Sequence, residues 1–115
     1  MQFPELNVSH PVYKQLLEVR REKGAGFIVL IDPDKLRDAD AAPFAEICED
    51  AGVDALFLGG SLLQAIELEP YVRGLRAATR LPVIGFPGSL NQVTRGLDAV
   101  LYLSVVSGRN PEYLF

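Results

Sequence analysis

The stretch from Gly26 to Lys35, which reads GFIVLIDPDK, decides the fold. The apolar residues 27–31 do not alternate with polar ones, which predicts a strand buried on both faces, as in a parallel sheet covered by helices. Two carboxylates, a proline and a lysine follow directly. Because ligands of α/β folds gather at the carboxyl ends of parallel strands, we expect functional residues at and just beyond Asp32.

Three later runs repeat this pattern, at residues 54–58, 82–86 and 98–103, and each is followed by small or polar residues. Phe27, Ala55 and Val83 lie 28 residues apart each time, which is the length of one strand-plus-helix unit. Strands and helices that alternate with right-handed crossovers form a parallel sheet. The sequence therefore predicts an α/β fold of the (β/α) TIM-barrel type, here its first four βα units, or half a barrel.

Helical spacing of apolar residues fills the intervals. The first helix precedes the first strand, with Ser9 as its N-cap, Pro11 in its first turn and Gly24 as its stop. A second helix is expected from Asp40 to Gly52, and residues 62–80 form a third helical region that breaks near Glu69 and restarts at Pro70. The expected buried face of the second helix consists of Ala41, Phe44, Ile47, Cys48 and Ala51.

Composition narrows the class of protein. The 115 residues suit one domain, residues 1–115, and the net charge of −4 without a basic cluster argues against nucleic-acid binding. Cys48 is the only cysteine, so it can form no intrachain disulfide, and we expect a buried core residue rather than a reactive thiol. No apolar run could span a bilayer and no signal-peptide pattern begins the chain, so we expect a cytoplasmic protein without a transmembrane segment.

Asp32 is the strongest candidate for chemistry. A carboxylate at a strand's carboxyl end can hold a hard cation such as Mg²⁺, with positions left for substrate phosphates. It can equally cap the turn that follows it. Asp34 and Lys35 lie further along the loop, where a solvated ion pair is the simpler interpretation of Asp34.

The loops after the other strands carry weaker signals. Gly59 and Gly60 either let a ligand approach the backbone or simply make the turn, and the Ser61 hydroxyl can cap a helix or bind a metal ion. Arg109, in the last loop, can face a phosphate or be merely exposed. His10 is the only histidine and precedes the first strand, which excludes Ser-His-Asp and Cys-His catalysis.

Taken together, the four predicted strands and the loops that follow them resemble the geranylgeranylglyceryl phosphate synthase and PcrB group of prenyltransferases. The similarity runs in order from Lys23 onward, and the combination of motifs is more specific than any single motif. In the PcrB branch a lysine precedes the first aspartate by two residues, where this chain has Leu30. The matching stretches are LIDPDK at residues 30–35, ALFLGGS at 55–61, PVIGFPG at 82–88 and DAVLYLSVVSGRNPEYL at 98–114.

The resemblance implies a (β/α)8 barrel that joins a polyprenyl (geranylgeranyl) diphosphate to sn-glycerol 1-phosphate with Mg²⁺, giving a precursor of ether lipids. Asp32 and Ser61 match the metal positions, and the catalytic residues stay unknown. The implied substrate-binding residues are Lys35, Gly59, Gly60, Phe86, Pro87, Gly88, Asn110 and Pro111.

The chain is short for such an enzyme, because a standard barrel takes about 250 residues. We expect the N-terminal half of the barrel, a homo-oligomer, and transient contact with a membrane surface through the prenyl product. Alone, the 115 residues should be neither a stable monomer nor active. Two alternatives stay open: a non-catalytic half-barrel module that associates with itself, and another phosphate-binding barrel enzyme.

Overall fold

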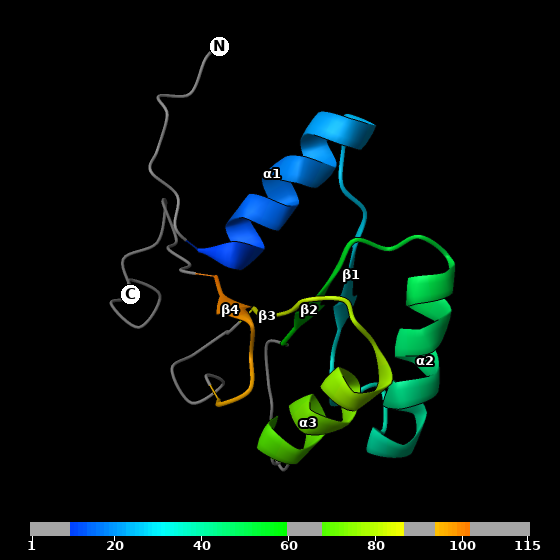
Figure 1. Cartoon of the computed structure of the whole chain (residues 1–115). Helices are drawn as coiled ribbons and strands as arrows, with labels where there is room; N and C mark the ends of the chain where they lie inside the picture. Colours follow the sequence, from blue (N-terminus) through cyan, green and yellow to red (C-terminus); the bar gives the residue numbers. More distant parts are fainter. Residues whose placement is uncertain (1–9, 60–67, 87–93, 102–115) are drawn as a thin grey trace, which may run out of the picture.

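A four-stranded parallel sheet forms the centre of the molecule (Figure 1). The computed structural model describes residues 10–59, 68–86 and 94–101. Neighbouring strands follow one another in sequence order, as in a barrel of βα units, so the predicted half-barrel arrangement is confirmed. The strands are β1 (Ile28–Ile31), β2 (Ala55–Leu58), β3 (Val83–Gly85) and β4 (Ala99–Val100).

The register of the strands corrects the spacing expected from sequence. Ile28 pairs with Ala55, and Leu56 pairs with Val83, so that paired residues lie 27 rather than 28 positions apart. A slip of one residue reverses the face on which a side chain lies. Ile28, and not Phe27, therefore shares a face with Ala55.

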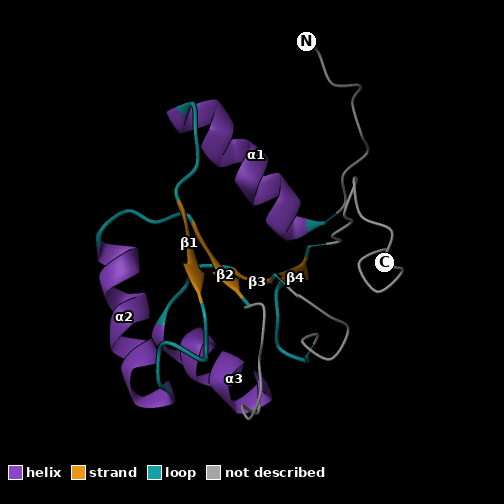
Figure 2. Ribbon diagram, turned by 180° about the vertical axis from the view of Figure 1, so that it is seen from behind, coloured by secondary structure: helices purple, strands orange, loops and turns teal. Residues whose placement is uncertain are grey.

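Helices lie on both faces of the sheet (Figure 2). Helix α1 is on one side, and α2 and α3 pack together on the other. We call the side that faces α1 the inner face and the opposite side the outer face. The helices are α1 (Pro11–Lys23), α2 (Asp38–Asp50) and α3 (Leu68–Ala78).

Three helix ends differ from the prediction. The N-cap of α1 is His10, whose Nδ1 accepts the Val12 N–H at 3.3 Å; the predicted Ser9 lies outside the described residues. Helix α2 begins at Asp38 with Arg37 as its N-cap, three residues before the expected cap Asp40, because both aspartates favour the amino end of a helix. Helix α3 runs through Pro70 without a break, since a proline in the first turn removes no helical hydrogen bond.

The outer face carries the larger core. Tyr71, Val72 and Leu75 of α3 are buried against the sheet, and Cys48 of α2 is only 4 % exposed. This burial confirms the expected core cysteine, and it raises the pKa of the Cys48 thiol. The predicted face of α2 was partly wrong. Its buried stripe is Ala41, Ala45 and Cys48, with Phe44 partly buried, whereas Ile47 and Ala51 point to solvent.

The inner face is less completely covered. Val12 and Leu16 of α1 pack on Ala55 and Ile84 of the sheet. Leu30, which also lies on this face, stays 55 % exposed. One face of the sheet is thus closed by two helices, while apolar surface remains open on the other.

A repeated clamp holds the amino-terminal edge of the sheet. The Asp54 N–H donates to the Phe27 carbonyl and the Phe27 N–H donates to Asp54 Oδ2, both at 2.8 Å. Asp98 makes the same two bonds with Val83, also at 2.8 Å. The aspartate before β2 and the aspartate before β4 each fasten the start of the preceding strand.

Candidate functional site

The carboxyl ends of β1, β2 and β3 meet at one edge of the sheet. The Gly59 N–H donates to the Ile31 carbonyl at 3.0 Å, and the Phe86 N–H donates to the Leu58 carbonyl at 2.7 Å. Asp32, Gly59 and Phe86 are the first residues beyond their respective strands. The structure therefore brings together three positions singled out from sequence.

Asp32 organises a tight turn with its own atoms. Its carbonyl accepts the N–H groups of Lys35 at 2.9 Å and Leu36 at 3.0 Å, and its Oδ1 accepts the Asp34 N–H at 2.9 Å. Asp32 therefore does cap the turn that follows it, and this role occupies one of its two carboxylate oxygens. No donor reaches Oδ2 from the residues that the structure describes. The half-buried carboxylate can hold the turn and still bind a ligand.

Asp34 and Lys35 sit at the exposed tip of this turn. No ion pair joins them within the described ranges, so the simple interpretation of Asp34 as half of a surface pair is not what the geometry shows. Lys35 lies three residues from Asp32, at the same edge of the sheet. Its ammonium group can meet an anionic ligand there, as the substrate-binding prediction requires.

Gly59 has a packing reason to be glycine. A Cβ at this position would overlap the carbonyl oxygen of Phe86, a backbone atom that cannot move aside cheaply. The two backbones approach closely because the Phe86 N–H bonds to Leu58 on the neighbouring strand. The glycine is therefore needed for strand packing whether or not a ligand contacts it.

An apolar surface lies beside Asp32 on the inner face. Leu30 pairs with Phe57 and Phe57 with Ile84 across the sheet, so the three share one face. The rings of Phe57 and Phe86 lie with centroids 5.6 Å apart. Sequence reasoning chose Phe86 but missed Phe57 and Leu30. The signal that could have identified them is the alternation of side chains between the two faces of β1 and β2. A strand that is apolar on both faces does not show this alternation in its sequence.

The Asp32 carboxylate is a suitable ligand for a magnesium ion that a substrate helps to hold. Within residues 10–59, 68–86 and 94–101 no group of three His, Cys, Asp or Glu side chains could form a metal cage. Mg²⁺, however, commonly binds through one or two carboxylates together with substrate phosphates. One carboxylate with an oxygen not engaged by any described donor suits that mode and does not suit an all-protein cage.

Several predicted site residues lie outside the described ranges. They include the second proposed metal ligand and most of the expected prenyl groove. These residues are Gly60, Ser61, Pro87, Gly88, Asn110 and Pro111.

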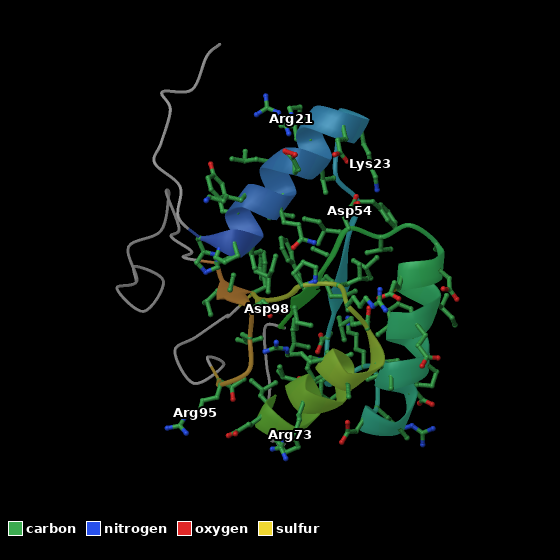
Figure 3. All side chains as sticks on the ribbon, viewed as in Figure 1. Arg21, Lys23, Asp54, Arg73, Arg95 and Asp98 are labelled. Atoms are coloured by element: carbon green, nitrogen blue, oxygen red, sulfur yellow. The ribbon has the colours of Figure 1, made fainter. Side chains whose placement is uncertain are left out.

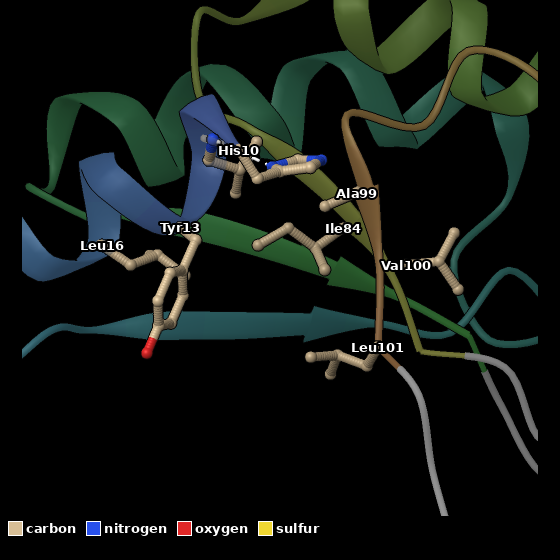
Figure 4. A pocket seen from close by; sticks show the side chains of 8 residues that line it. His10, Tyr13, Leu16, Ile84, Ala99, Val100 and Leu101 are labelled. Atoms are coloured by element: carbon tan, nitrogen blue, oxygen red, sulfur yellow. Dashed lines mark hydrogen bonds between the residues drawn. The ribbon is translucent and has the colours of Figure 1, made fainter. Parts of the chain in front are cut away.

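A separate apolar pocket of about 210 Å³ opens on the inner face, between the start of α1 and strands β3 and β4 (Figure 4). Among the described residues, its lining has no carboxylate and does not include the Asp32 turn. The pocket is lined by His10, Val12, Tyr13, Leu16, Ile84, Ala99, Val100 and Leu101.

None of the described helices has the length and apolar character needed to cross a bilayer.

Comparison with known proteins agrees with this architecture. A crystal structure of (S)-3-O-geranylgeranylglyceryl phosphate synthase from Thermoplasma acidophilum, in complex with its substrate sn-glycerol-1-phosphate, superposes with a TM-score of 0.72 and 31 % identity. The match covers 86 % of this chain and 41 % of that one. Wild-type geranylgeranylglyceryl phosphate synthase from Thermoplasma volcanium gives the same TM-score at 30 % identity, with the same coverage of both chains.

Sequence relatives carry the same name. Geranylgeranylglyceryl phosphate synthase from Chitinophaga pinensis is 49 % identical over 104 residues, which cover 90 % of this chain and 41 % of the relative. The Flavobacterium johnsoniae protein of that name is 33 % identical over 110 residues, with 96 % and 45 % coverage. The chain thus spans less than half the length of these relatives. The PcrB family model matches residues 17–115, and the chain belongs to the PcrB family.

Proposed function

We propose that the protein is a Mg²⁺-dependent prenyltransferase, or a part of one, that joins a polyprenyl diphosphate to sn-glycerol 1-phosphate. The observation that carries the proposal is Asp32, held at the carboxyl end of β1 beside an apolar surface, in a chain of the PcrB family. The name of its structural neighbour supports the glycerol phosphate substrate.

The chemistry requires one bond to form and one to break. The 3-hydroxyl oxygen of glycerol 1-phosphate bonds to C1 of the prenyl chain, and the bond from C1 to the diphosphate oxygen breaks. Diphosphate leaves with the bonding electrons, and the hydroxyl proton is released. The 3-oxygen is the attachment point because that position appears in the neighbour's name. We assign no catalytic base to this chain.

Each side of the site suits one part of the substrates. When bound, Mg²⁺ neutralises the charge that develops on the departing diphosphate. Asp32, together with Ser61, would hold that ion, and Lys35 would contact the diphosphate. Phe57 and Phe86 offer an apolar wall for the prenyl chain, and Leu30 extends it with exposed surface. The loops at residues 87–88 and 110–111 would extend this groove.

We also propose that this chain forms the amino-terminal half of the barrel and needs a covering partner. Its sheet leaves apolar inner-face surface such as Leu30 open, and every 100 Å² of such surface costs about 2.5 kcal/mol. The missing cover can be further polypeptide or a second copy. The 115-residue chain alone should therefore self-associate and transfer no prenyl group. Light scattering beside a transferase assay tests this, and a compact, active monomer would contradict it.

The decisive experiment uses the intact protein with radiolabelled sn-glycerol 1-phosphate and geranylgeranyl diphosphate. Product should form in the presence of Mg²⁺. Product formation should stop when EDTA removes the Mg²⁺ and should resume when Mg²⁺ is added back. Replacing glycerol 1-phosphate by its enantiomer is the matched control. If the intact protein forms no prenyl ether under these conditions, the proposed reaction is wrong. The alternative of a non-catalytic half-barrel module would then be preferred if the protein still forms a defined oligomer.

A further inference from the structure

The turn that carries Asp32 is tied to the rest of the molecule by a buried hydroxyl. Tyr71 of α3 is 2 % exposed, and its hydroxyl donates to the Leu36 carbonyl at 2.8 Å. Leu36 closes the turn at its other end, because its N–H donates to the Asp32 carbonyl at 3.0 Å. The chain of bonds from Tyr71 to Asp32 thus passes through one residue.

Leu36 also leads directly into α2. The Arg37 carbonyl already accepts the Asp40 and Ala41 N–H groups as the first bonds of that helix. The Leu36 carbonyl lies before them and takes its hydrogen bond from Tyr71 instead. The tyrosine therefore joins the Asp32 turn, the start of α2 and the body of α3 at one point.

The surroundings of the phenol keep it a donor. Burial, and then the carboxylates of Asp38, Asp32 and Asp40, raise the pKa of Tyr71 to about 12. The phenol therefore stays protonated at any working pH, and its proton is directed to the carbonyl. The neutral Tyr71 hydroxyl restrains the loop by donating to a backbone carbonyl, and it makes no hydrogen bond to the Asp32 carboxylate.

We propose that Tyr71 is a positioning residue for the cation site: through Leu36 it fixes the turn that aims the Asp32 carboxylate. This inference rests on the proposed role of Asp32 in holding Mg²⁺. A ligand whose supporting hydrogen bonds are lost typically binds its metal 10–100-fold less tightly. Because Tyr71 acts through the backbone and does not bond the carboxylate itself, the lower end of that range is expected.

The test is Tyr71→Phe in the intact protein, which removes the hydroxyl and keeps the ring. Mn²⁺ binding in the presence of inorganic pyrophosphate should weaken by roughly tenfold. Amide hydrogen exchange of residues 32–36 should become faster.

Thr79→Val is the matched control. Thr79 is also buried, and its hydroxyl also fastens α2 to the end of α3, by donating to Glu49 Oε1 at 2.7 Å. It has no bond to the Asp32 turn. This variant should lose stability without changing Mn²⁺ affinity or the exchange of residues 32–36.

The outcomes separate the two proposals. Unchanged Mn²⁺ affinity, or unchanged exchange of the turn, in Tyr71→Phe would overturn the positioning role. Equal loss of Mn²⁺ affinity in Thr79→Val would overturn it too, because the effect would then reflect stability alone. If wild-type protein binds Mn²⁺ with pyrophosphate but transfers no prenyl group, the proposed reaction fails while the Tyr71 comparison still decides its own question.

Discussion

Aspartates stand at both edges of the sheet, and their surroundings differ. At the amino-terminal edge, Asp54 is clamped to Phe27 and paired with Lys23 at 2.6 Å (Figure 3). Asp98 is paired with Arg76 at 3.3 Å. At the carboxyl edge, Asp32 bonds only within its own turn, as far as the described residues extend.

This difference separates a structural aspartate from a candidate ligand. The side chain of Asp54 is 7 % exposed, and both of its oxygens are used by protein donors. Asp32 keeps an oxygen that no described donor uses. Residues at the carboxyl edge of a (β/α) barrel serve function, and those at the amino-terminal edge serve stability. Residue type alone did not distinguish the structural aspartates from the candidate ligand, whereas their hydrogen-bond and ion-pair partners did.

The largest effect is expected from Asp32→Asn in the intact protein. Removing the charge should lower turnover by at least about 100-fold, because a metal ion supplies several kcal/mol of charge stabilisation and each 1.4 kcal/mol is a factor of ten. The far-UV circular dichroism spectrum should not change. Asp34→Asn, in the same turn, is the control and should keep most activity. Full activity in Asp32→Asn would remove the distinction between the edges.

Gly59→Ala tests how tightly the carboxyl edge is packed. The added methyl group would meet the Phe86 carbonyl, so the free energy of unfolding should fall by about 1–3 kcal/mol or more. Gly74→Ala is the matched control, because its methyl group would have no neighbour closer than 3.9 Å. Within α3 that change should stabilise the protein by about 0.5–1 kcal/mol. Urea denaturation measures both, and equal effects would refute the close-packing argument.

Asp54→Ala should damage stability and spare chemistry. It removes the charged carboxylate that accepts the part-buried Phe27 N–H, which should cost about 1–3 kcal/mol of unfolding free energy. Substrate turnover by the folded variant should match that of the wild type. Thermal denaturation and a transferase assay at a temperature well below the transition make the comparison. A selective loss of turnover would show that the amino-terminal edge serves function as well.

The clamp also predicts a dependence of stability on pH. The Lys23 hydrogen bond, and then the Phe27 N–H, lower the pKa of Asp54 in the folded state. The stabilisation is therefore present above the unfolded-state pKa, about 4, and is lost as the pH falls towards the lower folded-state pKa. Asp54→Asn should flatten this part of the stability profile. Glu49, whose pKa is lowered by its bonds to Arg80 and Thr79, remains in both proteins and contributes to the residual slope.

The smallest effect is expected from Lys23→Ala. Its side chain is 52 % exposed, so the pair with Asp54 should contribute no more than about 1 kcal/mol. A double-mutant cycle with Asp54→Ala, followed by urea denaturation at low and high salt, measures the coupling. If the coupling exceeded the whole cost of Asp54→Ala, the ion pair and not the backbone clamp would hold this edge.

Local pattern in the sequence was enough to predict most of the fold. Apolar runs of strand length, glycine stops and the near-constant repeat identified the four strands, their parallel order and the edge at which Asp32 lies. The expected break near Glu69 and part of the expected buried face of α2 were wrong. The remaining errors were of one to three residues, at the N-cap of α1, the start of α2 and the strand register. Such boundaries depend on which of several adjacent polar residues packs or caps best, and sequence pattern does not rank them.

What each functional side chain does was decided only by the tertiary structure. The partners of Asp54 and of the Asp32 turn come from distant segments: Lys23 is 31 residues from Asp54, and Tyr71 is 35 residues from Leu36. The need for glycine at position 59 likewise comes from Phe86, just beyond the end of the next strand. Sequence pattern reports the periodicity of a single segment, whereas hydrogen bonds and close packing between segments depend on how the βα units dock. The sequence therefore placed an aspartate at the carboxyl edge, and the docking of the units determined which aspartate kept an oxygen beyond the reach of the described donors.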